Sequence, residues 1–237
     1  MEIAIGLGKN EDVLEAVKHF PFKIHIARTN RELLDYLKNP NIDGVIRGSL
    51  ESNIIVELKK EFPNLFRASL LEKEGHQFLL SPVGIDEGDS MDSKITIIKE
   101  CANAMSLLGK QPKIALISGG RKNDKGRSNK IDQSIEECEA IESKLKNQYD
   151  IKHYYILIEE AIKDKANIII APDGISGNII FRSLVLVAGI KSNGALTLNQ
   201  PTMFIDTSRS QNVQGYINSI NLLKKLIEKK ESRGSLK

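Results

Sequence analysis

The sequence predicts an α/β fold of two lobes, each with a parallel or mixed sheet that helices cover. Short apolar runs alternate with stretches in which apolar residues recur every three or four positions, as in strand–helix–strand units. The rhythm returns later in the chain, and polar loops at 81–94 and 118–132 interrupt it. We expect a first lobe from residues 1–75 and 203–237 and a second lobe from residues 76–202.

Each expected element rests on its own pattern. The expected strands are β-branched or leucine-rich runs bounded by Gly, Pro or Ser, and they lie at 2–6, 22–27, 43–48, 77–83, 113–118 and 167–172. The expected helices carry apolar stripes at steps of three and four, and they lie at 11–20, 30–37, 51–62, 91–108, 131–145, 179–189 and 213–227. Because the cysteines and several methionines fall on these stripes, we assign them to the core.

The composition argues against several classes of function. Lys and Arg total 34 and Asp and Glu total 31, and this balance does not favour a nucleic-acid-binding surface. Cys101 and Cys138 form no CxxC motif, and the four histidines are scattered, so we expect neither disulfides nor a metal site. The sequence has no 18-residue apolar run and no signal-peptide pattern, so we expect a cytoplasmic protein that does not enter the membrane.

The stretch APDGISGNIIFRSLVLVAGI, residues 171–190, reads as a strand end, a turn with two glycines and an apolar helix. The first turn of a helix exposes backbone N–H groups, so small residues there let an anion approach closely. We interpret Asp173, Ser176, Gly177 and Asn178 as part of a phosphate site. The alternative is that Ser176 or Asn178 caps the helix and that the glycines only satisfy turn geometry.

Three further turns follow expected strands and precede expected helices. After the strand in 204–220, Ser208 and Arg209 offer a hydroxyl beside a guanidinium, which suits phosphate. Two of these turns have an alternative without a ligand: a surface arginine beside a helix start at 209, and a mobile, solvated loop at 118–132. The candidates in the other two turns are Arg47, Gly48 and Ser49 in the first, and Ser118 and Gly119 in the second.

Several of these segments resemble one family, the phosphate acetyl- and butyryltransferases. PDGISGNIIFRSL resembles the turn and following helix of these enzymes, and it is similar to a turn of the phosphate acyltransferases of phospholipid synthesis. DGVIRGSL, KITIIKECANAMSLLGKQPKIALISGG and GALTLNQPTMFIDTSRS resemble other family segments in the same order, so the resemblance covers most of residues 41–228.

The resemblance implies the two-domain fold of isocitrate and isopropylmalate dehydrogenases, a phosphorylated ligand in the cleft between the domains, and a homodimer. It implies phosphate or coenzyme A as the ligand. The positions that match the family's turn are Asp173, Gly177 and Asn178, those that match its clamp are Ser208 and Arg209, and those that match its strand-end loop are Ser118 and Gly119.

The chain also departs from the family's pattern. Gly215 stands where the acetyltransferases have an aspartate that takes the proton from the thiol of coenzyme A, and Ser210 replaces a usual glycine. We therefore expect a phosphorylated or acyl-phosphate metabolite to bind, with acyl transfer altered or lost, and the catalytic residues stay open. The short length and the VGIDEG loop resemble methanogenesis marker protein 4, an archaeal group also named methyltransferase subunit X. That resemblance implies the alternative, an accessory subunit with methyltransferase subunits as partners.

Overall fold

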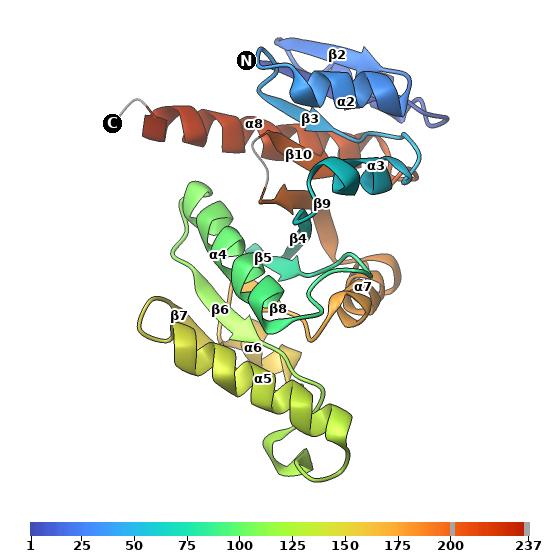
Figure 1. Cartoon of the computed structure of the whole chain (residues 1–237). Coiled ribbons are helices and arrows are strands. Elements are labelled where there is room, and N and C mark those ends of the chain that lie inside the picture. The colour runs from blue at the N-terminus through green and yellow to red at the C-terminus, as the bar shows by residue number, and fades with distance from the viewer. Residues whose placement is uncertain (200–201, 235–237) are drawn as a thin grey trace. The chain divides into compact units, whose positions relative to one another are not determined.

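The computed structural model describes residues 1–199 and 202–234 of the chain (Figure 1). The chain divides into two compact units. Unit 1 consists of Met1–Leu65 and Asn193–Lys237, and unit 2 consists of Phe66–Ser192. Both units are built from strands and helices in alternation, so the predicted α/β class, with mixed sheets covered by helices, is confirmed.

The strands of unit 1 run in the order β2-β1-β3-β10-β9. The first four are mutually parallel, and β9 pairs antiparallel with β10. Their bounds are β1 Glu2–Gly6, β2 Lys23–Ala27, β3 Gly44–Ile46, β9 Lys191–Leu198 and β10 Met203–Asp206. Because the β2, β1, β3 and β10 strands are parallel, their carboxyl ends meet at one edge, where the loops that follow β3 and β10 lie.

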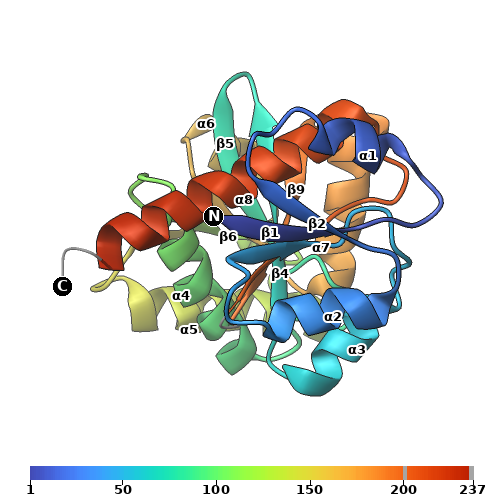
Figure 2. The same cartoon turned by 90° about the horizontal axis from the view of Figure 1, so that it is seen from above.

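Helices cover both faces of this sheet, with α1 and α8 on one side and α2 and α3 on the other (Figure 2). Leu33, Leu37, Ile54 and Leu58 of α2 and α3 pack with Ala4 and Val45 in one buried cluster. The alternate strand residues Ile3, Ile5 and Ile46 are also buried, as a strand covered on both faces requires. The helix bounds are α1 Asp12–Val17, α2 Asn30–Lys38, α3 Ile54–Glu61 and α8 Val213–Gly234.

The strands of unit 2 run in the order β4-β5-β8-β6-β7. β4 and β5 form an antiparallel pair, and the other pairings are parallel. The strand bounds are β4 Phe66–Lys73, β5 His76–Ser81, β6 Lys113–Leu116, β7 Asp150–His153 and β8 Ile168–Ile170. The helix bounds are α4 Met91–Leu107, α5 Asn129–Leu145, α6 Ile158–Lys163 and α7 Gly174–Arg182, which continues as a π-helix over Ser183–Val187. A 3₁₀ turn occupies Lys122–Asp124 in the loop after β6.

The core assignments of the cysteines are confirmed, because Cys101 on α4 and Cys138 on α5 are both buried. Burial raises the pKa of each thiol to about 12. Neither thiol is therefore a nucleophile at neutral pH.

The predicted apolar helix at 179–189 differs from the structure in its start and its burial. The helix begins earlier, at Gly174, and several of its large apolar side chains face solvent. Ile179 is 60% exposed and Val187 is 86% exposed. Ile180, Phe181, Leu184 and Val185 of the same segment are partly buried against the core of unit 2, so its apolar residues divide between a packed face and an exposed face.

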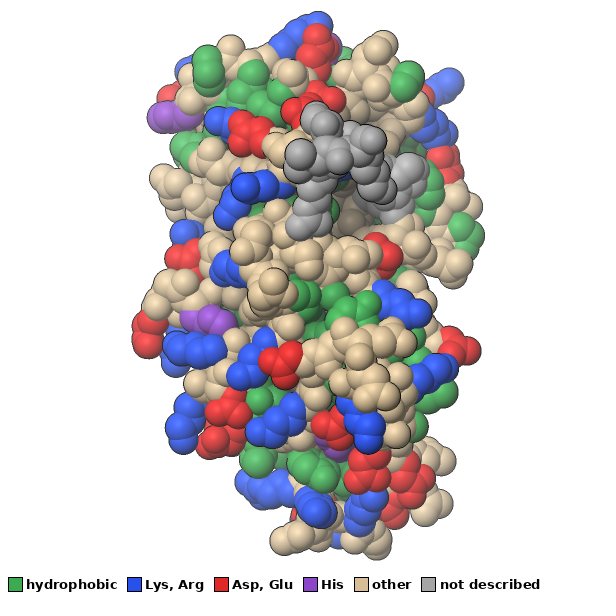
Figure 3. Space-filling view, turned by 90° about the vertical axis from the view of Figure 1, so that its left-hand side faces the viewer, with side chains coloured by type: hydrophobic (Ala, Val, Ile, Leu, Met, Phe, Trp, Pro, Cys, Tyr) green, Lys and Arg blue, Asp and Glu red, His purple; other side chains and the backbone are tan. Residues whose placement is uncertain are grey.

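Acidic and basic side chains intermingle on the face shown in Figure 3, which agrees with the near balance of charge in the sequence. Among the described residues, no helix has both the length and the apolar content needed to cross a bilayer.

Candidate functional site

Unit 2 has a pocket of about 460 Å³ at the carboxyl ends of its parallel strands. The loops after β5, β6 and β8 contribute to it, together with the first turns of the helices that follow them. This is the place where open parallel sheets usually bind ligands. The lining residues are Gly88, Asp89, Lys94, Gly119, Ser128, Lys130, Ile131, Gln133, Ser134, Glu137, Pro172, Asp173 and Ser176.

Three helices begin at or beside this pocket. The N-caps of α4 and α5 are Ser90 and Ser128, whose hydroxyls accept from Ser93 N at 3.3 Å and from Ile131 N at 3.4 Å. The N-cap of α7 is Asp173, whose Oδ1 accepts from Ser176 N at 2.7 Å. The first N–H groups of a helix have no intrahelical acceptor, and each helix start carries a partial positive charge. Each of the three helix starts therefore contributes a partial positive charge at the pocket.

The formal charges in the pocket are mixed. Lys94 lies on the first turn of α4, and its ammonium bonds the carboxylate of Glu137 on α5 at 2.5 Å. The Lys94 side chain is only 7% exposed, whereas that of Glu137 is 26% exposed. Asp89 and the exposed Lys130 also line the pocket. The pocket thus contains both a buried cation and carboxylates that compete with a bound anion.

The two glycines of the α7 turn let the helix approach the loop after β5. A Cβ on Gly174 would lie 1.7 Å from the carbonyl oxygen of Gly84, and one on Gly177 would lie 1.8 Å from that of Pro82. The Asn178 amide donates to Val83 O at 2.9 Å. These contacts hold the start of α7 against the 82–84 loop. The alternative that Ser176 or Asn178 caps the helix is wrong, because Asp173 is the cap.

Ser118 and Gly119 lie at the end of β6, and only Gly119 lines the pocket. Gly119 lines the pocket, and its N–H donates to the hydroxyl of Ser134 at 2.9 Å. Ser118 is buried behind it, with its Oγ 2.9 Å from Nε2 of His153 and 3.3 Å from Gly120 O. Nδ1 of His153 is buried and has no hydrogen-bond partner among the described residues. Burial lowers the pKa of His153, which favours the neutral ring.

His153 was not predicted from the sequence, because its only local signal was a single histidine near the end of an unrecognised strand. Residues 121–130 of the loop after β6 are almost all exposed, as the solvated alternative expects, and the loop also contains internal hydrogen bonds. The carboxylate of Asp124 accepts from Arg121 N at 2.8 Å, and this bond is the main cause that lowers the pKa of Asp124. Gly126 N donates to the carboxylate of Asp132 at 2.8 Å.

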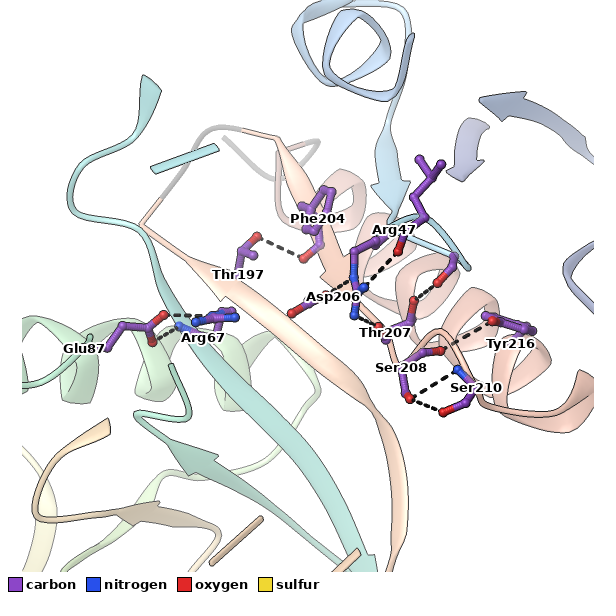
Figure 4. A network of polar contacts seen from close by, with 12 residues as sticks. Arg47, Arg67, Glu87, Thr197, Phe204, Asp206, Thr207, Ser208, Ser210 and Tyr216 are labelled. Atoms are coloured by element: carbon purple, nitrogen blue, oxygen red, sulfur yellow. Dashed lines mark hydrogen bonds and ion pairs between the residues drawn. The ribbon is translucent and has the colours of Figure 1, made fainter. Parts of the chain in front are cut away.

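In unit 1, Arg47 is buried and its guanidinium is bound by protein groups (Figure 4). It bonds the carboxylate of Asp206 at 2.5 Å, Leu50 O at 3.0 Å, and Thr207 O. The hydroxyl of Ser49 accepts from Gly8 N at 2.8 Å and donates to Asn10 O at 2.9 Å. These side chains fix the turn after β3.

Gly48 has a positive φ of 63° within this turn, and a Cβ there would lie 1.8 Å from Gly6 O. A glycine is therefore required at this position. Together with Arg47 and Ser49, it gives the turn after β3 a structural role.

Ser208 and Arg209 lie in the turn after β10, and their side chains are exposed. The Ser208 hydroxyl is 3.2 Å from that of Ser210, and Tyr216 OH donates to Ser208 O at 3.4 Å (Figure 4). The Arg209 guanidinium pairs with the carboxylate of Glu51, and the two side chains are 51% and 61% exposed. An exposed pair of this kind is easily exchanged for another anion.

The structure brings Gly119, Asp173 and Ser176 together in the unit 2 pocket, with Ser118 directly behind it. Gly177 and Asn178 contact the 82–84 loop. The candidates of unit 1 form two groups, a buried one around Arg47 and an exposed one at Ser208 and Arg209. That Asn178 and Arg209 contact one ligand stays a prediction.

No protein-family model matches the chain. Curated relatives do. The chain is 41% identical over 233 residues to an "Uncharacterized methyltransferase" of Methanocaldococcus jannaschii, a match that covers 93% of this chain and 96% of the relative. A "Putative methyltransferase mtx subunit X" of Methanosarcina mazei is 40% identical over 182 residues, which is 75% of this chain and 65% of that protein.

The chain belongs to this archaeal family of methyltransferase-named proteins. The predicted resemblance to the subunit X group is thereby confirmed. Solved structures show which known fold this chain has. A branched-chain phosphotransacylase from Enterococcus faecalis matches with a TM-score of 0.75 at 17% identity, covering 96% of this chain and 99% of that chain. A phosphotransacetylase from Streptococcus pyogenes matches with a TM-score of 0.70 at 16% identity, covering 98% and 94%. The fold is thus that of the phosphotransacylases, as the resemblance implied.

Proposed function

We propose that this chain binds a phosphorylated or acyl-phosphate metabolite in the pocket at the carboxyl ends of β5, β6 and β8. The observation that carries this proposal is the arrangement of helix starts: α4, α5 and α7 all begin at or beside a pocket of about 460 Å³. The partial positive charges of these helix starts suit a phosphate group. The buried ammonium of Lys94 and the exposed one of Lys130 add full positive charge.

We propose that Ser208 and Arg209 of unit 1 also bind phosphate. Their side chains are exposed, and the carboxylate that pairs with Arg209 is exposed as well. The planar guanidinium of an arginine can bond two phosphate oxygens at once, whereas a lysine ammonium acts as a point charge. A hydroxyl beside the guanidinium adds a further hydrogen bond. The names of the structural neighbours, phosphotransacylase and phosphotransacetylase, favour the same class of ligand for this fold.

Acyl transfer to a thiol is not part of this proposal. The resemblance places a base at residue 215, where this chain has glycine. The side chain of Gln211 fills the space there: a Cβ on Gly215 would meet Gln211 Cβ and Cδ at 3.0 Å. A general base contributes about 10²- to 10⁴-fold to such a reaction, so its loss leaves binding without efficient transfer. Gln211 is a neutral amide and cannot accept the thiol proton.

Thermal unfolding with inorganic phosphate and with acetyl phosphate tests the binding, and an exchange assay between acetyl phosphate and coenzyme A tests the chemistry. At a ligand concentration of about 100 Kd, binding stabilises the native state by about 2.7 kcal/mol, which raises the melting temperature by several degrees. Sodium chloride at the same ionic strength is the control. The proposal fails if neither phosphate compound raises the melting temperature above that control, or if exchange is as fast as in a phosphotransacetylase.

A second candidate function is that of a subunit in an assembly, and the exposed face of α7 favours it. Ile175, Ile179, Leu186 and Val187 are all at least 59% exposed on α7 and the π-helix that continues it. Large apolar side chains gathered on one short helical segment are typical of protein–protein contacts. We propose that a second copy of this chain covers them.

The relatives named as mtx subunit X suggest a methyltransferase subunit as a further partner. Sedimentation of the purified chain separates the two cases. A dimer supports self-association, and a monomer that enters a complex only with a methyltransferase subunit supports the accessory role.

A further inference from the structure

One ion pair in the unit 2 pocket joins a buried cation to a partly exposed carboxylate. Lys94 bonds Glu137 at 2.5 Å, and both side chains line the pocket. Lys94 comes four residues after the N-cap Ser90, so its ammonium is held near the positive end of α4. A cation at a helix start is unfavourable, as is a lysine that is only 7% exposed.

These two unfavourable features give Lys94 a strong requirement for an anion. Glu137, from the third turn of α5, supplies it. The pair differs from a core ion pair because it opens on the pocket and because Glu137 is 26% exposed. Glu137 can therefore rotate toward solvent, while Lys94 stays behind in the pocket. The site keeps its cation in place and has a carboxylate that is free to leave.

We propose that Glu137 occupies the place on Lys94 that the phosphate group of the ligand takes, so that Glu137 sets the affinity and the charge preference of the pocket. This inference rests on the proposed function. If the carboxylate of a ligand replaced that of Glu137 on Lys94, the negative charge beside Lys94 would not increase. A phosphate dianion brings a second charge and more acceptor oxygens, and it interacts more strongly than a carboxylate with Lys94 and with the N–H groups at the starts of α4 and α5.

The pocket is therefore selective for dianionic phosphomonoesters or inorganic phosphate over carboxylates. Removing the charge at 137 while keeping the shape, with Glu137→Gln, should strengthen phosphate binding about 10-fold, the scale of one charge-assisted contact. The same variant should begin to bind acetate. If the ion pair serves only to stabilise the fold, the opposite result is expected. Its loss would then weaken the binding of phosphate and would not create binding of acetate.

The experiment is a calorimetric titration of the folded chain with inorganic phosphate and with acetate. The matched control is Glu139→Gln, two residues along α5, because Glu139 pairs with Lys125 at 2.8 Å and is not among the residues that line the pocket. We expect Glu139→Gln to bind phosphate like the wild type, Glu137→Gln to bind about 10-fold tighter, and Lys94→Gln to bind at least about 10-fold more weakly.

The outcomes separate the inference from the function on which it rests. If the wild type binds phosphate and Glu137→Gln binds it equally or more weakly, the exchange of partners is refuted while the binding site stands. If neither protein binds phosphate, both are refuted. A competition measurement does not depend on the variants: in the wild type, excess acetate should not displace phosphate, and displacement overturns the charge preference.

Discussion

Replacing Gly177 by alanine tests whether the glycines of the α7 turn serve close packing. Gly177 lies inside α7, where alanine is normally the better helix former by about 1 kcal/mol. In this structure, however, the new Cβ would lie 1.8 Å from the carbonyl oxygen of Pro82 and 3.2 Å from the Cβ of Ala171. The oxygen belongs to the backbone and cannot turn aside, so the helix or the loop has to move by roughly 1 Å.

The expected effect is a loss of about 2 kcal/mol in the free energy of unfolding. Overpacking costs about 1–3 kcal/mol, a backbone clash lies at the upper end, and the helix propensity of alanine returns up to about 1 kcal/mol. Urea unfolding followed by circular dichroism measures the difference.

The control for this test is Gly119→Ala. Its Cβ would meet Ser134 Oγ at an ordinary 3.5 Å, and its φ lies outside the left-handed region, so we expect a change within about 0.5 kcal/mol. A Gly177→Ala protein as stable as the wild type, or more stable, refutes the packing argument.

The remaining predictions concern charge and assembly. Arg209→Ala should weaken the binding of acetyl phosphate about 10-fold without changing the unfolding free energy by more than about 1 kcal/mol, because the pair with Glu51 is exposed; calorimetry showing an unchanged Kd contradicts it. Since burial lowers the pKa of His153 from its usual value of about 6.5, the unfolded chain takes up the proton first as the pH falls. Stability should therefore be complete above about pH 6.5 and decrease below it, and His153→Gln should flatten this part of the urea-midpoint profile; an equally steep profile in the variant argues against the buried neutral ring. Ile179→Glu should convert a dimer into a monomer in sedimentation, and an unchanged mass excludes α7 from the contact.

Short β-branched runs between glycine, proline and serine were sufficient to predict most of the parallel strands. β1, β2, β3, β6 and β8 fall within the expected segments and β5 overlaps its segment except for His76, because short runs rich in β-branched residues or leucine stand out locally. β4, β7 and β9 were not predicted. β7 has only four residues, Asp150–His153, with alternating burial, and β4 carries charge at both Arg67 and Lys73. Their partners in the sheet decide that such segments are strands, and no local pattern records those partners.

The residues of the candidate site were predicted only in part. The turn signals that point to Gly119, Asp173 and Ser176 are local, since small and capping residues follow strand ends. The signals that were missed are not local. Lys94 and Glu137 lie on two different helices as ordinary stripe-flanking charges, and only the packing of α4 beside α5 brings their side chains to 2.5 Å in one pocket. His153 was likewise missed because its contact is not local: the fold places its Nε2 2.9 Å from the Oγ of Ser118.

The two arginines predicted for phosphate binding show what decides between structure and function. Both follow strands and stand beside small polar residues, so the sequence pattern predicts phosphate binding for both of them. Arg47 is buried, and Asp206, Leu50 O and Thr207 O hold its guanidinium. Freeing it for a ligand would break an ion pair whose two side chains are only 9% and 13% exposed, and breaking a buried pair costs about 3–5 kcal/mol.

Arg209 is half-exposed, and its only ion-pair partner among the described residues is the exposed Glu51, so exchanging that partner costs at most about 1 kcal/mol. Of the two arginines, we therefore expect Arg209 to be the one that binds phosphate. The same rule applies to Lys94: a cation can exchange its partner for a ligand when the partner is exposed. Glu137 is more exposed than Lys94, so we expect Glu137 to be the group that leaves.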